Sequence, residues 1–120
     1  MTNEKTINIC GKDVRLRYCA ATETGFEQLA GKSIGNIDYQ SQEDLMRLSV
    51  SAILAAYTRT KEDAPISSED LMYEAKPAEI VELFKAVLEA RAAWYDVPLV
   101  LEESIKSEQA DQSDEAPKNV

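Results

Sequence analysis

The fold class is decided by residues 6–18, which read Thr6-Ile7-Asn8-Ile9-Cys10-Gly11-Lys12-Asp13-Val14-Arg15-Leu16-Arg17-Tyr18. Apolar and polar residues alternate on both sides of Gly11, as they do in a strand with one buried face. A two-residue Gly11-Lys12 loop of type II′ would pair Ile9 with Val14 and Ile7 with Leu16. The alternating apolar side chains would then share one face. We therefore expect an N-terminal β-hairpin that packs on a core.

The same register separates the two cysteines. Cys10 lies beside the turn and Cys19 at the far end of the second strand. At about 3.3 Å per residue they are roughly 20–25 Å apart, whereas a disulfide needs Cα atoms within about 7 Å. We expect two free thiols.

Beyond the hairpin, local start and stop signals predict helices. Thr24 and Glu27 have the spacing of a capping box, which predicts a short helix that ends near Gly31. Residues 32–40 are typical of a loop. Ser41 then caps a second helix, which is apolar on most sides as far as Tyr57 and is therefore expected to be central.

Two further helices follow a charged connection. The sequence Ile66-Ser67-Ser68-Glu69-Asp70-Leu71 combines a capping box from Ser67 to Asp70 with a hydrophobic staple between Ile66 and Leu71. It predicts a short helix that ends before Lys76. Pro77 suits the first turn of the next helix, which is the longest and runs to about Asp96.

Composition changes after residue 101. Residues 102–120 contain six acidic residues against two lysines, and Ile105 and Val120 are their only large apolar side chains. Such a segment cannot offset its ordering entropy by burial. We therefore expect one globular domain over residues 1–101 and a disordered acidic tail over 102–120. The expected fold class is α+β and mostly α, with the hairpin followed by about four helices.

The charge of the chain restricts its partners. There are 22 acidic residues against 13 basic ones, a formal net charge of -9. A negative surface repels nucleic-acid phosphates and anionic membranes. The most apolar run, residues 48–57, has about half of the roughly 20 residues that span a bilayer, and the N-terminus does not resemble a signal peptide. We expect a cytoplasmic protein that binds neither nucleic acid nor membrane.

The side chains that most enzymes use are missing. The sequence has no histidine, which excludes the commonest general base and the Ser-His and Cys-His arrangements. Two distant cysteines without histidine do not make a structural zinc site. Gly31-Lys32-Ser33 matches the end of a P-loop, but Phe26 stands where that motif needs glycine. We expect no enzyme activity, no metal and no cofactor.

The remaining candidates are aromatic. Trp94 and Tyr95 point about 100° apart on the last helix, so burying both requires a wide cover. Aromatic residues at helical spacing are usually core residues, but they are also common anchors of protein interfaces. The candidate protein-binding residues are accordingly Tyr57, Leu83, Ala90, Trp94 and Tyr95. The exposed edges of a small hairpin also favour a homo-oligomer.

The order of these motifs resembles the tail assembly chaperones of long-tailed phages. The resemblance spans residues 5 to about 97. It consists of the opening strand and its return, the Glu23-Thr24-Gly25-Phe26 helix start, the apolar 45–57 helix, the Pro65-to-Leu71 start and the long last helix.

This resemblance implies a binding role without catalytic residues. Proteins of that family bind the tape-measure protein, keep its long helices soluble and help to recruit tail-tube subunits. From the residues alone, two other functions stay open. One is an acidic decoy of a mobile element, either a DNA mimic or another inhibitor. The other is a protein-interaction domain unrelated to tails.

Overall fold

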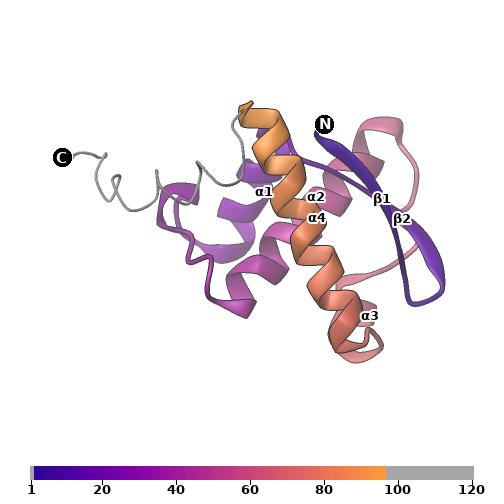
Figure 1. The fold of residues 1–120 in the computed structure, drawn as a ribbon. Coiled ribbons are helices and arrows are strands. Elements are labelled where there is room, and N and C mark those ends of the chain that lie inside the picture. Colours follow the sequence, from indigo (N-terminus) through magenta and orange to yellow (C-terminus); the bar gives the residue numbers. More distant parts are fainter. Residues whose placement is uncertain (1, 97–120) are drawn as a thin grey trace.

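The computed structural model describes residues 2–96, so the segment 102–120 that we expect to be disordered lies outside the described residues. Figure 1 shows a hairpin followed by helices, which confirms the expected α+β, mostly α class. The elements of the described chain are β1 (Glu4–Ile9), β2 (Lys12–Arg17), α1 (Ala20–Ala30), the 3-10 turn η1 (Ile34–Asn36), α2 (Gln42–Thr60), α3 (Ser68–Tyr73) and α4 (Pro77–Tyr95).

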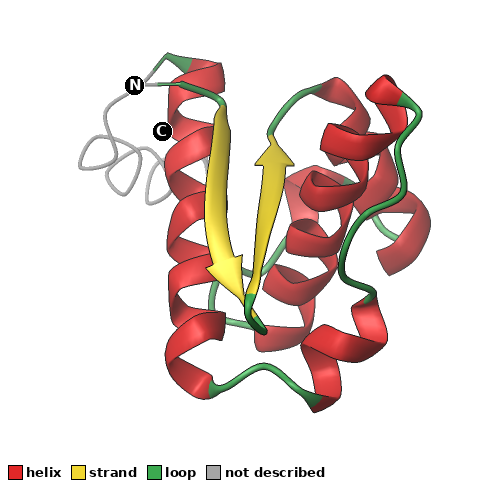
Figure 2. Ribbon diagram, turned by 90° about the vertical axis from the view of Figure 1, so that its right-hand side faces the viewer, coloured by secondary structure: helices red, strands yellow, loops and turns green. Residues whose placement is uncertain are grey.

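The hairpin lies against the helices (Figure 2), with β1 packed on α4 and β2 on α2. Helix α2 also contacts α1 and α4, as its apolar composition predicts for a central helix. The inner face of the hairpin is fully buried at Ile9, Val14, Leu16 and Tyr18, which join one core with side chains of α1, α2 and α4. Burial of this face stabilises the hairpin, since an isolated pair of strands is only marginally stable in water.

The register of the hairpin differs from the expected one. Ile7 pairs with Val14 and Ile9 with Lys12, so the loop is Cys10-Gly11 and not Gly11-Lys12. Both loop residues have positive φ, 54° at Cys10 and 76° at Gly11, which is the requirement of a type I′ turn. The shift moves the pairing by two positions, which preserves the side-chain alternation. The expected apolar face is therefore correct although the turn is wrong.

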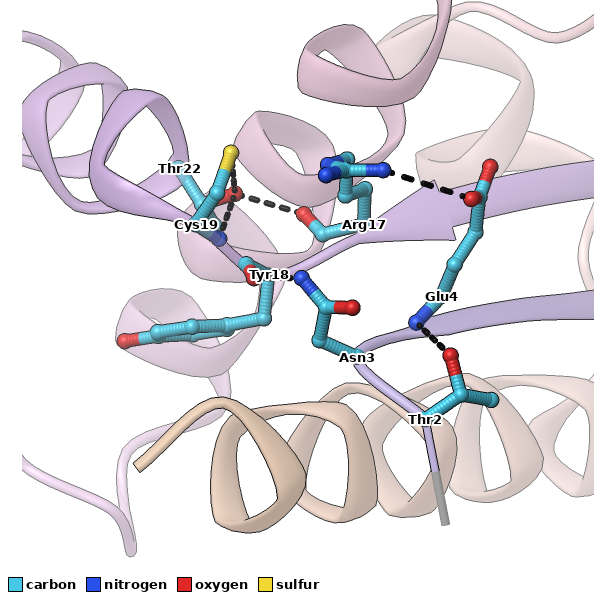
Figure 3. A network of polar contacts seen from close by, with 7 residues as sticks. All are labelled: Thr2, Asn3, Glu4, Arg17, Tyr18, Cys19 and Thr22. Carbon is cyan, nitrogen blue, oxygen red and sulfur yellow. Dashed lines mark hydrogen bonds and ion pairs between the residues drawn. The ribbon is translucent and has the colours of Figure 1, made fainter. Parts of the chain in front are cut away.

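Helix α1 begins five residues before the expected start. Its N-cap is Cys19, and Thr24 lies inside the helix. Figure 3 shows the buried Thr22 hydroxyl between two backbone groups: it donates to the Arg17 carbonyl at 2.6 Å and accepts from the Cys19 N–H at 3.2 Å. These bonds begin the helix directly after β2. The expected end is confirmed, because Gly31 closes α1 with a φ of 71°.

The other helix starts are confirmed. The Ser41 hydroxyl accepts from the Asp44 N–H at the start of α2, and Ser67 and Asp70 form the capping box of α3. Both halves of the staple, Ile66 and Leu71, are buried. Pro77 occupies the first turn of α4. The two cysteines are free thiols, as expected.

A candidate protein-binding groove

Of the five candidate protein-binding residues predicted from the sequence, three are buried and two are partly exposed. Leu83 and Ala90 lie on the inner side of α4 and are fully buried in the core. Tyr57 is buried too, and its hydroxyl accepts a 3.0 Å hydrogen bond from the backbone N–H of Arg15 in β2. These three residues hold the hairpin on the helices and are not on the surface.

Trp94 and Tyr95 remain partly exposed, at 37% and 44%. They form an aromatic cluster with the buried Tyr18, in which ring centroids lie 4.9–6.4 Å apart. Both tyrosine hydroxyls donate to the same Oε2 atom of Glu23. Burial and the neighbouring Glu23 carboxylate raise the pKa of both phenols. The cluster joins the end of α4 to the start of α1, and both of its tyrosine hydroxyls donate their hydrogen bonds within the chain.

An apolar groove opens elsewhere, between the first turns of α2, helix α3 and the first half of α4. It encloses a cavity of about 550 Å³, within the range of 300–1,000 Å³ typical of binding pockets. The residues that line it are apolar or uncharged polar: Gln40, Gln42, Leu45, Met46, Leu71, Met72, Ala75, Pro77, Ile80, Val81 and Phe84. Uncharged walls of this kind suit an apolar ligand surface and provide no acid, base or nucleophile.

The most exposed apolar side chains of the described residues lie on α3 and at this groove. Tyr73, Met72 and Val81 are 80%, 65% and 62% exposed. Consecutive helical residues point about 100° apart, so α3 cannot bury Leu71, Met72 and Tyr73 against the same surface. Leu71 faces the core, and Met72 and Tyr73 face solvent. That run of three large apolar residues was the sequence signal for this surface, and the sequence analysis missed it.

Two smaller cavities extend the groove along α2. One of about 410 Å³ shares Gln42, Met46 and Met72 with the main cavity and ends at Glu43 and Arg47. The other, of about 230 Å³, lies across α3 and is lined by Val50, Ile53, Leu54, Ile66, Ser67, Ser68 and Leu71. Apolar surface thus continues along one side of α2 on both sides of α3.

Ion pairs hold the N-terminal end of α2. Asp44 is buried, and its carboxylate accepts from the Lys32 Nζ at 2.7 Å and from the Asp38 N–H at 2.8 Å. The Lys32 ammonium and then the Asp38 amide hold the pKa of Asp44 below its usual value. Arg47 pairs with Glu43 one turn away at 2.8 Å. None of these four charged residues lines the main cavity, whose walls are apolar or uncharged polar.

Residues 2–96 contain no group of three or more carboxylate or cysteine ligands placed to hold a metal ion. The helices of this range also lack the combination of length and apolar composition that a membrane span requires. Comparisons with protein-family models, curated sequences and solved structures gave no match.

Proposed function

We propose that this chain is a non-enzymatic tail assembly chaperone of a long-tailed phage or prophage. In this role it binds apolar helical segments of a tape-measure protein in the host cytoplasm and assists assembly of the tail tube. The observation that carries the proposal is the uncharged groove between α2, α3 and α4. The order of sequence motifs supports the family.

The groove has the chemistry of a helix-in-groove site. An amphipathic helix binds by laying its apolar face into such a surface. Met46 and Met72 line the groove, and methionine side chains adapt to different apolar partners because they are unbranched and polarizable. A chaperone of a long protein needs that tolerance, since successive segments of its client differ in sequence.

Charge further restricts the partner. The net charge of -9 favours a client helix whose polar face is basic. The apolar contacts provide affinity and the charges speed association, so added salt reduces the association rate more than it increases the dissociation rate.

The test is co-expression with the long helical protein encoded by the downstream gene, followed by co-purification and light scattering. The variants are Met72→Glu and Val81→Glu, which place a carboxylate at the groove without altering the core. Covering an exposed Met or Val is worth about 1–2 kcal/mol, so each variant is expected to weaken binding roughly tenfold or more. Leu29→Glu is the matched control, because Leu29 is 51% exposed on α1 and lies outside the linings of these cavities.

The proposal stands if the native chain and Leu29→Glu hold the helical protein in solution and the two groove variants do not. It fails if the native chain does not bind that protein. It also fails if all three variants bind equally well. An acidic decoy would bind a basic protein through its charged surface, so Val81→Glu would leave that binding intact.

A further inference from the structure

We infer that the cavities on the two sides of α3 are halves of one docking site, and that a client helix occupies it by displacing α3. This inference rests on the proposed function and specifies how the groove takes its client. Leu71 is the link between the halves, because it lines both the 550 Å³ cavity and the 230 Å³ cavity.

The floor of the two halves is a single strip of α2. Met46, Val50, Ile53 and Leu54 lie on one side of this helix, at the spacing i, i+4, i+7 and i+8. Helix α3 crosses that strip through Leu71. From Gln42 to Leu54 the floor extends about 18 Å at 1.5 Å per residue, which matches a client helix of about 12 residues, or three turns.

Helix α3 is lightly held. Of its six residues Leu71 is the buried one, while Met72 and Tyr73 are mostly exposed. The chain before it is exposed from Lys61 to Asp63. Ile66 is buried, and a 2.9 Å hydrogen bond from Lys12 Nζ to the Pro65 carbonyl ties that connection to the hairpin. Segments with few buried contacts open at a lower free energy than the whole domain unfolds.

The start of α4 is held by contacts that do not involve α3. The start of α4 is fixed by Glu79, whose carboxylate accepts from the Lys76 N–H at 2.9 Å and from the Cys10 N–H at 3.0 Å. The hairpin therefore holds the beginning of α4 directly. When α3 leaves, α2 keeps its place as the floor of the site and α4 as its wall.

The occupant that fits is an amphipathic helix of at least three turns with a basic polar face. Its apolar side would replace Leu71 over Met46, Val50 and Ile53, and would contact Val81 on α4. A helix shorter than about three turns would fill only one half. Because α3 must first leave, the observed affinity is the intrinsic affinity reduced by the fraction of open molecules.

The experiment tethers α3 to the hairpin. Lys12 and Glu69 are exposed and line none of the three cavities, and Lys12 reaches the Pro65 carbonyl just before α3, so Lys12→Cys and Glu69→Cys provide two accessible thiols outside the site. Cys10→Asn and Cys19→Ser first remove the native thiols. A short bis-maleimide bridges the new pair, and the matched control carries N-ethylmaleimide on each thiol, which adds similar bulk without a tether. The probe is the helical protein encoded by the downstream gene.

The inference expects the capped control to bind the probe and the bridged protein to bind at least about tenfold more weakly, since a tether removes the open population. Equal binding by the two forms would overturn the inference and leave the proposed function standing. If the native chain does not bind the probe, the proposed function fails and the inference fails with it.

A second measurement needs no client. In native-state hydrogen exchange of the unmodified protein, the amides of Leu71 and Glu74, which donate within α3, are expected to exchange at least about 100-fold faster than those in the centres of α2 and α4. Exchange at the rate of global unfolding would overturn the inference. It would leave the groove itself in place as a binding site for helices that do not need α3 to move.

Discussion

Truncating two buried leucines to alanine is expected to give very different losses of stability. Leu71 and Leu83 are both almost fully buried, in α3 and at the centre of α4 respectively. Leu83 packs within the core that joins the hairpin to the helices. Its truncation removes side-chain contacts and leaves a cavity that the surrounding elements cannot close. We expect Leu83→Ala to reduce the free energy of unfolding by about 4 kcal/mol.

The loss in free energy of unfolding that Leu71→Ala can cause has a lower upper limit. Burying a leucine contributes about 1.5–3 kcal/mol, but a chain whose α3 has undocked still keeps the core between the hairpin, α1, α2 and α4. The loss cannot exceed the free energy that docks α3, because beyond that point the undocked form becomes the native state. We expect a loss of about 2 kcal/mol with a smaller urea m-value, since less surface remains to be exposed on unfolding.

Urea denaturation of both variants, followed by circular dichroism and by fluorescence of the single tryptophan, Trp94, measures these losses. Hydrogen exchange of Leu71→Ala should find α3 unprotected and the amides of α2 protected. Equal losses for the two variants, with an unchanged m-value, would refute the reasoning, because α3 would then be part of the cooperative core. Leu29→Ala on the exposed side of α1 is the control and should change stability by less than about 0.5 kcal/mol.

Three further predictions concern turn chemistry and titration. Cys10 has a positive φ in the type I′ turn; Cys10→Asn should stabilise the chain by roughly 0.5–1 kcal/mol and Cys10→Val should destabilise it, as measured by thermal unfolding. Burial beside Glu23 raises the pKa of Tyr18 and Tyr95, so stability should fall as pH rises above about 10, where the unfolded phenols lose their protons first. Urea midpoints measured from about pH 8 to 11 should fall less in Glu23→Gln, and an identical slope in both proteins would contradict this. The Lys32 ammonium lowers the pKa of Asp44. The stability that the Asp44 carboxylate contributes is therefore complete above the ordinary aspartate pKa of about 3.9 and is lost as pH falls through the lowered value. Asp44→Asn should be less stable near neutral pH and its stability less sensitive to acid, as followed by circular dichroism.

Local chemistry explains which sequence predictions were correct. The Ser41 and Ser67 caps, the Gly31 stop and Pro77 at the start of α4 each act within one helical turn. They could therefore be located without knowing the fold. The apolar face of the hairpin was also predictable, because alternation survives a register shift of two residues.

The sequence predictions were wrong at the start of α1 and at the hairpin turn, where more than one local conformation was possible. Thr24 and Glu27 have good cap spacing, but Thr22 is buried and bonded to Arg17, which extends α1 back to Ala20. The turn could have used Gly11 at either central position. The observed register places Gly11 second and requires Cys10 to adopt a positive φ.

The order of hairpin and helices, the free cysteines and the apolar face of the hairpin could be predicted from the chain alone, since they follow from spacing along one strand or one turn. Three features depend on how the elements pack: Leu83 and Ala90 lie in the core, the Tyr57 hydroxyl bonds to the hairpin, and Met72 and Val81 line one groove. An amphipathic pattern assigns a residue only to a side of its own helix. Whether a second helix covers that side depends on the packing of segments that are distant in sequence, and the six residues of α3 are too few to cover it completely.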